Sequence, residues 1–403
     1  MRNKPRIRFK GFTEDWEQRK LGEVVKSYSG GTPTASNKEY YGGDIPFIRS
    51  AEINSDTTEL YITQKGLDNS SAKIVEKGTI LYAMYGATSG EVGISKINGA
   101  INQAILAMIP LNYDGKIIAQ YLRKNKESII GKYLQGGQGN LSANIILELP
   151  IQLPGLEESN QIAYFLESVD NIITLHQRKL EKLKLAKKAL LQKLFPKNGS
   201  QFPEIRFKDF TDAWEQCKLG DLLILLKDGS HGTHKNTSEG VYLLSAKNIK
   251  NGRINIMPDD RIISWDDYNV IHKSYELQSG DILLTIVGSI GETAIYNLKT
   301  KVTFQRSVAF LRPNSKLKNG FLYTLINTDR FQNQLQTKQV VSAQPGIYLG
   351  DLASINITYP KNVLEQEKIY NIFKGIENSI TLHQRKLDKL QEVKKGLLQK
   401  MFV

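Results

Sequence analysis

The heptapeptide TLHQRKL occurs twice in this chain, at Thr174–Leu180 and at Thr381–Leu387, identical at all seven positions and 207 residues apart. Around each copy, apolar residues recur at alternating steps of four and three, which is the pattern of a coiled-coil seam. The pattern predicts two long helices, the first over Glu157–Phe195, and neither helix could bury such a seam alone. Lysine interrupts both seams at one matching step, as Lys187 and Lys394. The other predicted seam positions are Ile162, Leu166, Val169, Ile173, His176, Leu180, Leu183, Leu190, Leu194, Ile369, Phe373, Ile376, Ile380, His383, Leu387, Leu390, Leu397 and Met401.

A second repeated stretch, which we call the WEQ motif, begins each half of the chain. IRFKGFTEDWEQRKLG at Ile7–Gly22 returns as IRFKDFTDAWEQCKLG at Ile205–Gly220, with twelve of sixteen positions identical and an offset of 198. The chain is therefore a tandem duplication of a unit of about 200 residues, in which a WEQ motif and a variable body precede a long helix. The core that seats each body on its helix is predicted to contain Trp16, Leu21, Trp214 and Leu219.

The duplication divides the chain into four segments. They are a first body over residues 1–156, a first helix over 157–196, a second body over 197–362 and a second helix over 363–403. Short strands are indicated over 45–53, 78–86, 241–249 and 280–288, and short helices near 117–126 and 319–335. The predicted fold class is α+β, with two strand-rich bodies in tandem, each followed by a long helix. The helices are expected to pair as an antiparallel coiled coil with internal pseudo-twofold symmetry, and His176 to meet His383 near the symmetry axis as a polar register device.

The two bodies diverge in sequence, but two landmarks persist. The stretch Gly86–Glu91 corresponds to Gly288–Glu292, and Asn102-Gln103 corresponds to Phe304-Gln305. Function is expected in the loops of the bodies, because binding residues concentrate on loops that a rigid scaffold positions.

Composition and charge narrow the class of protein. The chain has 403 residues, 40% of them apolar, a formal net charge of +13 and a single cysteine, Cys217. No apolar run of about 18 residues is present, and the charged N-terminal stretch does not resemble a signal peptide, so a cytoplasmic protein without a membrane segment is expected. Arg178–Lys193 carries net +6 and Arg385–Lys400 net +4. This charge favours either pairing with the acidic half of the opposite helix or contact with phosphates.

Motifs of catalysis are missing from the sequence. It contains no phosphate-binding G-x-x-x-x-G-K-[ST], no G-x-S-x-G and no H-E-x-x-H. The two histidines of DGSHGTH, Asp228–His234, lack the helix that would align them as metal ligands, so neither a metal site nor a cofactor site is predicted. The chain is predicted not to be an enzyme.

The ordered and duplicated motifs resemble the DNA-specificity subunit of type I restriction–modification enzymes over essentially the whole chain. The features that carry the resemblance are the doubled F-x-x-x-W-E-Q-x-K-L-G motif, Gly30–Pro33, Tyr40–Pro46, Asp228–His231, Asn102-Gln103, Gln305-Arg306 and both copies of TLHQRKL.

The resemblance implies a reader built from two parts. Residues 1–156 and 197–362 would be target recognition domains, each reading one half of a bipartite asymmetric site in double-stranded DNA. The helices, with their seam residues, would set the spacer and dock two methyltransferase (M) subunits, to which motor-nuclease (R) subunits add. S-adenosylmethionine, ATP and Mg would belong to those partners. The alternative is a helical scaffold that joins partners without reading sequence, although a scaffold has no need of two different loop sets.

Candidate DNA contacts are polar loop residues, because amides suit adenine edges and arginine or lysine suits guanine. Glycine-rich loops that simply turn the chain are the competing interpretation, and a residue kept in both bodies, such as Gln103 with Gln305, favours a structural role. The candidates are Gly30, Gly31, Thr32, Ser36, Asn37, Lys38, Arg49, Tyr85, Thr88, Ser89, Asn102, Gln103, Gln135, Gln138 and Asn140 in the first body, and Ser230, His231, Thr233, His234, Lys235, Lys247, Asn248, Ser289, Gln305, Arg306, Gln339, Ser342 and Gln344 in the second.

Overall fold

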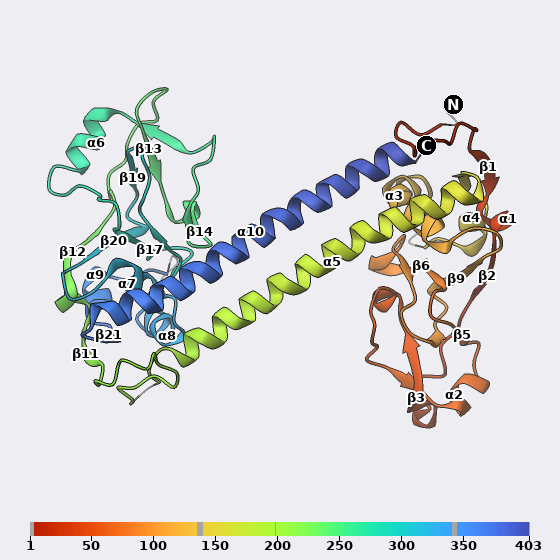
Figure 1. The fold of residues 1–403 in the computed structure, drawn as a ribbon, viewed down its shortest axis with the longest axis horizontal. Coiled ribbons are helices and arrows are strands. Elements are labelled where there is room, and N and C mark those ends of the chain that lie inside the picture. Colours follow the sequence, from red (N-terminus) through yellow and green to blue (C-terminus); the bar gives the residue numbers. More distant parts are fainter. Residues whose placement is uncertain (1–3, 135–139, 198, 341–344, 403) are drawn as a thin grey trace. The chain divides into compact units, whose positions relative to one another are not determined.

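The chain forms two compact units that each combine a strand-rich body with parts of both long helices (Figure 1). The computed structural model describes residues 4–134, 140–197, 199–340 and 345–402. Unit 1 comprises residues 1–177 together with 385–403, and unit 2 comprises residues 178–384. The four segments predicted from sequence follow the order of elements along the chain, whereas the compact units divide both helices near their middles.

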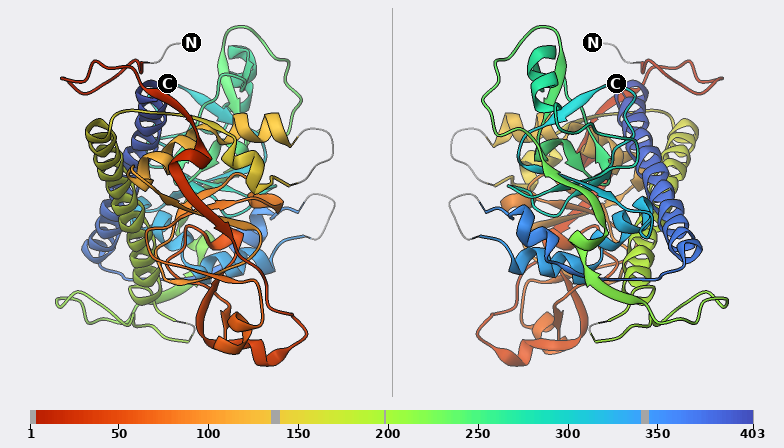
Figure 2. Two further views of the ribbon diagram at one scale, coloured as in Figure 1. Left: turned by 90° about the vertical axis from the view of Figure 1, so that its right-hand side faces the viewer. Right: turned by 90° about the vertical axis from the view of Figure 1, so that its left-hand side faces the viewer.

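The two long helices are α5, Leu156–Lys193, and α10, Val363–Met401. In unit 1 the start of α5 packs against the end of α10, where Ile162 and Leu166 share a core with Leu397 and Met401. In unit 2 the end of α5 packs in the same way against the start of α10. The helices therefore run antiparallel within each unit, and every predicted seam position is buried or half-buried. Figure 2 shows α5 beside the last turns of α10 along one side of the strands of unit 1.

The seam lysines are ion-paired between the two helices. In unit 1, Lys394 Nζ lies 2.5 Å from Asp170 Oδ1, and the side-chain amide of Gln120 donates to the same carboxylate at 3.0 Å. In unit 2, Lys187 and Glu377 form the corresponding pair. The predicted facing of basic and acidic helix halves is confirmed at these pairs. His176 belongs to unit 1 and His383 to unit 2, so their predicted meeting stays a prediction.

The described part of unit 1 contains two four-stranded sheets and a two-stranded one. The sheet β2-β9-β6-β7 is antiparallel, β4-β3-β8-β5 has a parallel β3–β8 pair, and β1 pairs with β10. Its strands are β1 Glu17–Lys20, β2 Val25–Ser29, β3 Tyr41–Ile48, β4 Tyr61–Ile62, β5 Lys73–Val75, β6 Ile80–Ala83, β7 Val92–Ile94, β8 Gly99–Ile101, β9 Ile105–Pro110 and β10 Pro150–Leu153. Its shorter helices are α1 Leu21–Val24, α2 Gln64–Asp68, α3 Gly115–Tyr133 and α4 Ala143–Leu147, with 3-10 turns η1 Lys38–Tyr40, η2 Ser50–Glu52 and η3 Gly86–Thr88.

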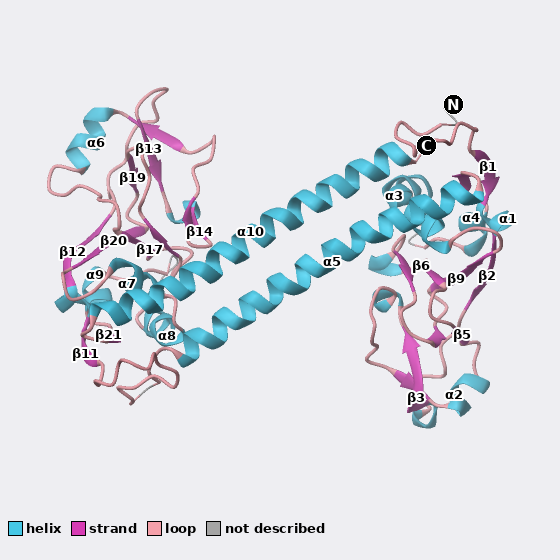
Figure 3. Ribbon diagram, in the orientation of Figure 1, coloured by secondary structure: helices cyan, strands magenta, loops and turns pink. Residues whose placement is uncertain are grey.

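Unit 2 repeats this plan with local additions (Figure 3). The sheets are β12-β20-β17-β18, β16-β13-β19 with a parallel β13–β19 pair, β11-β21, and an added pair β14-β15. Its strands are β11 Glu215–Lys218, β12 Leu223–Asp228, β13 Val241–Leu244, β14 Ile249–Lys250, β15 Arg253–Ile254, β16 Arg261–Ile263, β17 Ile282–Thr285, β18 Thr293–Ile295, β19 Val302–Phe304, β20 Val308–Pro313 and β21 Asn356–Tyr359. Its shorter helices are α6 Trp265–Ile271, α7 Asn319–Ile326, α8 Asp329–Thr337 and α9 Leu349–Ala353, with 3-10 turns η4 Leu219–Leu222 and η5 Ala246–Asn248.

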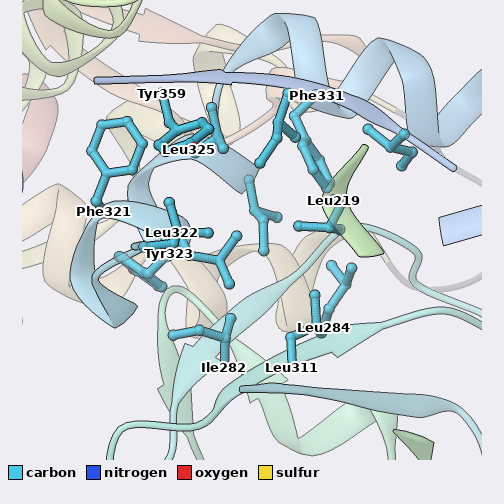
Figure 4. Packing of buried hydrophobic residues seen from close by; sticks show 14 of the residues in the cluster. Leu219, Ile282, Leu284, Leu311, Phe321, Leu322, Tyr323, Leu325, Phe331 and Tyr359 are labelled. Atoms are coloured by element: carbon cyan, nitrogen blue, oxygen red, sulfur yellow. The ribbon is translucent and has the colours of Figure 1, made fainter. Parts of the chain in front are cut away.

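The main core of each unit lies where the body meets the helices. Leu219, Phe321 and Phe331 of unit 2 pack over the strands that carry Ile282 and Leu311 (Figure 4). Ile369 and Phe373 of α10 belong to the same core. The prediction for the WEQ motifs is confirmed, because all four of the predicted seat residues are buried: Trp16, Leu21, Trp214 and Leu219.

The structure corrects one sequence landmark by a single residue. Ile48 pairs with Ile101 between β3 and β8, and Leu244 pairs with Phe304 between β13 and β19. Phe304 is therefore the counterpart of Ile101. It follows that Gln305 corresponds to Asn102 and Arg306 to Gln103, so the sequence alignment of Gln103 with Gln305 is wrong.

All four predicted strands end earlier than expected, with β6 ending at Ala83 and β17 at Thr285. β3 stops at Ile48, because the backbone N–H of Arg49 donates to the side chain of Glu52 at 3.1 Å and the chain turns into η2. β13 stops at Leu244 for the same reason, since the N–H of Ser245 donates to Asn248 Oδ1 at 2.9 Å. Within the described residues, no helix is both long enough and apolar enough to cross a membrane.

Candidate nucleic-acid interface

Several predicted contact loops of unit 1 meet where strands β2, β6 and β8 end, and we call this region the strand-end edge. The N–H of Gly31 donates to the carbonyl of Ile101 at 3.2 Å, and the hydroxyl of Thr32 donates to Gln103 Oε1 at 2.6 Å. The loop after β2 is thereby fixed to the loop after β8. The Thr32 hydrogen bond occupies the amide oxygen of Gln103, so the amide nitrogen of Gln103 remains as the donor of this exposed side chain.

Two further loops complete the strand-end edge of unit 1. The N–H of Met84 donates to the carbonyl of Ala104 at 2.8 Å, and the N–H of Leu141 donates to the carbonyl of Met84 at 3.0 Å. Tyr85 and Asn140 form an isolated antiparallel bridge beside this point. Predicted loops that lie far apart in sequence are thus joined by backbone hydrogen bonds at one edge.

Unit 2 has the same edge at the ends of β12, β17 and β19. The N–H of Ser230 donates to the carbonyl of Phe304 at 2.8 Å, and the N–H of Arg306 donates to the carbonyl of Ser230 at 3.0 Å. The N–H of Ile286 donates to the carbonyl of Ser307 at 2.9 Å. Ser230 therefore occupies the position that Gly31 occupies in unit 1.

Glycine precedes this crossover in both units for a steric reason. A Cβ on Gly30 would lie 1.9 Å from the carbonyl oxygen of Ile101, and one on Gly229 would lie 2.2 Å from the carbonyl oxygen of Phe304. No side chain fits at either distance. The scaffold of the edge is thus conserved between the units, while its side chains differ. Ser230 replaces Gly31 and Arg306 replaces Gln103.

A polar network fills the loop that follows Gly229 in unit 2. His231 Nε2 lies 2.7 Å from Asp228 Oδ2, whereas His234 Nδ1 lies 3.0 Å from Asp267 Oδ1. The other nitrogen of His234 is 2.6 Å from Ser230 Oγ. The two histidines therefore engage separate carboxylates. In the described part of the chain, no group of three or more His, Cys, Asp or Glu side chains is placed to hold a metal ion.

Exposure separates the predicted DNA contacts into three groups. The exposed ones are Thr32, Ser36, Lys38, Gln103, Asn140, His231, Thr233, Lys235, Lys247, Ser289 and Arg306. The half-buried ones are Asn37, Arg49, Tyr85, Thr88, Asn102, Ser230, His234, Gln305 and Gln339. The buried ones are Gly30, Gly31, Ser89 and Asn248. Gln135, Gln138, Ser342 and Gln344 lie outside the described residues. For the exposed residues, contact with DNA stays a prediction.

The buried residues require a correction, because their polar groups support the loops. Asn248 is fully buried, and its side-chain amide donates to the carbonyl of Asn255 at 2.8 Å and to Asp260 Oδ2 at 2.6 Å. The hydroxyl of Ser89 donates to the carbonyl of Gly86 at 2.9 Å. We therefore reassign both side chains, with Gly30 and Gly31, from base contact to loop support.

Arg49 is also committed within unit 1. Its guanidinium forms hydrogen bonds of 3.1 and 3.0 Å with the two carboxylate oxygens of Glu52, and a further one of 2.8 Å with Glu59. The hydrogen bonds from Arg49 lower the pKa of Glu52 to about 2. Arg49 thus stabilises the turn after β3, and a base contact would require it to leave two carboxylates.

Sequence reasoning missed Asp267 and Arg261. Asp267 lies on α6 and bonds His234, and the guanidinium of Arg261 on β16 donates to the backbone carbonyl of His234. Both residues come about 30 positions after the histidine, in a stretch of the second body that diverges from the first. No local pattern in the sequence connects them to the loop.

Comparison with known proteins identifies the family. The profile of the family described as "Type I restriction modification DNA specificity domain" matches residues 13–185 and again residues 211–392. The chain belongs to this family. The two specificity domains begin 198 residues apart and end 207 residues apart, which are the two offsets of the internal repeat. Each specificity domain thus includes a body and most of the long helix that follows it.

Individual specificity subunits are similar over the whole chain or over part of it. The type I restriction enzyme MjaVIII specificity subunit of Methanocaldococcus jannaschii is 26% identical over 407 residues, covering 96% of this chain and 91% of that protein. The EcoR124I/EcoR124II specificity subunit of Escherichia coli is 26% identical over 176 residues, which is 41% of this chain. The crystal structure of a type I S subunit from M. genitalium superposes with a TM-score of 0.66 at 17% identity, covering 99% of both chains, and so shares the fold. The resemblance found in the sequence is confirmed.

Proposed function

We propose that this chain is the non-catalytic DNA-reading subunit of a type I restriction–modification complex, in which each strand-end edge reads one half of a bipartite asymmetric site. The observation that carries the proposal is the contrast between scaffold and side chains. Both edges use the same backbone crossover beside Gly30 or Gly229, but they present different hydrogen-bonding groups. A protein that reads two unlike half-sites needs this combination, because each base pair shows its own pattern of donors and acceptors in the major groove.

The exposed side chains give each edge its own chemistry. In unit 1, Gln103 offers an amide donor whose orientation Thr32 fixes. In unit 2, Arg306 offers a guanidinium, whose fork suits the two acceptors of guanine. Lys38, the first residue of η1, and Lys235, which follows His234, are exposed and would supply sequence-independent contacts with phosphates.

The long helices would set the spacing of the half-sites and dock two methyltransferase subunits. Because the seam residues are packed within the chain, docking would use the outer helix faces rather than the seam. These faces carry exposed apolar residues, including Tyr164, Leu175 and Leu185 on α5 and Leu382 on α10. Leu175 and Leu382 are the same position of the TLHQRKL repeat. S-adenosylmethionine, ATP and Mg would be held by the methyltransferase and motor-nuclease partners, in the cytoplasm.

The test is to co-express the chain with its methyltransferase subunit and to map methylated adenines in a genome by single-molecule sequencing. We expect one asymmetric motif with two defined halves and a spacer of constant length. Replacing residues 24–155 by the body of another specificity subunit should change one half only. Methylation without a motif, or a stable complex that methylates nothing, would instead support the alternative of a helical scaffold.

A further inference from the structure

A chain of hydrogen bonds in unit 2 leads from helix α6 to the strand-end edge. Asp267 Oδ1 lies 3.0 Å from His234 Nδ1, and His234 Nε2 lies 2.6 Å from Ser230 Oγ. Ser230 sits at the backbone crossover of the edge, where its N–H and its carbonyl are both bonded to the loop around Phe304 and Arg306. The device is confined to unit 2, because the corresponding position of unit 1 is Gly31.

The carboxylate determines which imidazole nitrogen of His234 carries hydrogen. The hydrogen bond from His234 lowers the pKa of Asp267, which keeps the carboxylate ionised and able only to accept. His234 Nδ1 must therefore donate, and in the neutral ring Nε2 must accept. Among the described residues, a further charged group bonded to this histidine is Arg261, which donates to its backbone carbonyl and leaves both ring nitrogens to Asp267 and Ser230.

The tautomer in turn fixes the hydroxyl of Ser230. A serine hydroxyl has one hydrogen and two lone pairs. Its hydrogen points to His234 Nε2, and one lone pair accepts the N–H of Gly232 at 3.2 Å. Among the described residues, no other group uses the second lone pair, and the side chain is half-exposed. Ser230 can thus offer an incoming partner one acceptor and no donor.

We propose that Ser230 is a specificity-determining residue of unit 2 that presents an acceptor to the major groove, held in that state by the positioning residues His234 and Asp267. The inference rests on the proposed function. Adenine N6 and cytosine N4 are the donors that bases expose in the major groove, whereas guanine and thymine show acceptors there. The base facing Ser230 in the half-site read by unit 2 is therefore adenine or cytosine.

The three groups have the connectivity of a hydrolytic Ser–His–Asp triad, but their surroundings do not suit acyl transfer. A triad works with backbone N–H groups that are free to bind an oxyanion next to the serine. The N–H of Ser230 donates to the carbonyl of Phe304, and the N–H of Gly232 donates to Ser230 Oγ itself. These two N–H groups are therefore already used, which favours a role for Ser230 in setting whether the edge offers a donor or an acceptor.

Asp267→Asn tests the inference without altering Ser230. The hydroxyl of Ser264 donates to Asp267 Oδ2 at 3.1 Å, so the oxygen of the new amide stays with Ser264 and its nitrogen faces His234. An amide donor would force His234 Nε2 to carry the hydrogen, as the corresponding change does in a serine protease. Ser230 would then accept from His234 and turn its own hydrogen outward. The expected result is a change at one base of one half-site. A cytosine should give way to guanine or thymine, whereas an adenine should lose its preference over guanine, because both purines offer N7 as an acceptor.

The experiment maps the methylation motif of the co-expressed complex for the wild type, Asp267→Asn, Ser230→Ala and the control Asp266→Asn, which makes the same charge change on an exposed residue of the same helix. Ser230→Ala should make the same base degenerate, so that the preference for that base in relative methylation falls at least tenfold. Asp266→Asn should leave the motif unchanged. Retention of the other half-site shows that each variant complex is assembled. A wild-type motif that neither Ser230→Ala nor Asp267→Asn alters would overturn this inference and leave the proposed function standing, as would equal methylation with all four bases at that position in Asp267→Asn. A wild-type complex that methylates without any motif would overturn both this inference and the proposed function.

Discussion

Arg8 holds the carboxylate of Glu158 with two parallel hydrogen bonds, of 2.6 Å from Nε and 2.8 Å from Nη2. The indole N–H of Trp16 donates to the same carboxylate at 3.2 Å. These contacts join the WEQ motif to the first turn of α5, and the carboxylate is almost fully buried, with 1% of its side chain exposed. Unit 2 repeats the arrangement with Arg206, Trp214 and Glu365 at the first turn of α10.

We expect Glu158→Gln to lower the free energy of unfolding by about 3 kcal/mol, because it leaves the guanidinium of Arg8 without its buried counter-charge. Chemical denaturation of the full chain, followed by circular dichroism, measures the change. Asp15→Asn is the control, since the Lys4–Asp15 pair is 59% exposed on both sides and should contribute less than about 1 kcal/mol. Equal losses of unfolding free energy in the two variants would contradict the stabilising role of the buried Arg8–Glu158 pair.

The seam pair of unit 2 should behave as a coupled unit. Lys187 Nζ lies 2.6 Å from Glu377 Oε1, and the hydroxyl of Tyr323 donates to the same carboxylate. Lys187→Met is expected to cost about 2 kcal/mol of unfolding free energy, since a half-buried carboxylate loses its charged partner. Adding Glu377→Leu should recover part of that loss, because both charged groups are then replaced together while the buried hydroxyl of Tyr323 loses its acceptor. Additive losses in this double-mutant cycle would show that the two side chains do not act as a pair.

Acid should weaken unit 1 through Glu52. Its pKa of about 2 lies below that of an unfolded glutamate, so its contribution is complete above about pH 4.5 and is lost as pH falls towards 2. The contribution is at most about 3 kcal/mol. In acid titrations monitored by near-UV circular dichroism, Glu52→Gln should flatten the stability profile between those pH values. Lys65→Ala, which removes the partner of the exposed Glu39, should change the profile far less, because solvent screens that pair.

The crossover glycine of unit 1 should tolerate no side chain. Gly30→Ala would place Cβ against the carbonyl of Ile101 and is expected to abolish reading of one half-site while the other half remains defined in the methylation motif. Gly131 on α3 is the control, because a Cβ there meets nothing within 4 Å and the helix favours alanine over glycine. Gly131→Ala should raise stability by about 0.5–1 kcal/mol. An intact motif in Gly30→Ala would show that the edge can rearrange.

Docking of methyltransferase subunits should depend on the exposed leucine of each TLHQRKL repeat. Leu175 is 66% exposed and Leu382 54% exposed, so Leu175→Asp and Leu382→Asp should prevent co-purification of the methyltransferase without shifting the melting temperature. Leu183→Asp, in the seam, should instead lower the melting temperature by itself. Val270→Asp on α6 is the control, because it also replaces an exposed apolar residue by aspartate, but in the unit 2 body.

The long helices, the duplication and the seats of the bodies were predictable because their signals are local and repeated. Steps of four and three recur over 33 residues in each helix, and tryptophan marks the core at the same place in both halves. Helix α5 accordingly begins at Leu156, one residue from the position that the sequence indicates.

The binding loops were less predictable, because side chains from distant parts of the sequence determine which loop residues are already bonded or buried. Arg49 has the chemistry of a base contact, but Glu59 and Glu52 bind it within unit 1. Asn248 has the same side-chain amide as an exposed asparagine, yet it is buried and donates a hydrogen bond to Asp260. Asp267 sets, through His234, whether the hydroxyl of Ser230 points its hydrogen inward or outward. Only the folded chain brings Asp267 and Ser230 together.

The composition of unit 1 also has a consequence for the order of events during synthesis. Met401 and Phe402 are buried in the core that contains Trp16 and Ile162, so this core stays open until residues 385–402 have left the ribosome. All of unit 2, residues 178–384, emerges in between, which takes about 10–40 s at typical translation rates. The second unit can therefore fold first. Until the end of α10 emerges, part of the apolar surface of the N-terminal body stays uncovered. During that period a chaperone or an already folded partner subunit would bind this surface.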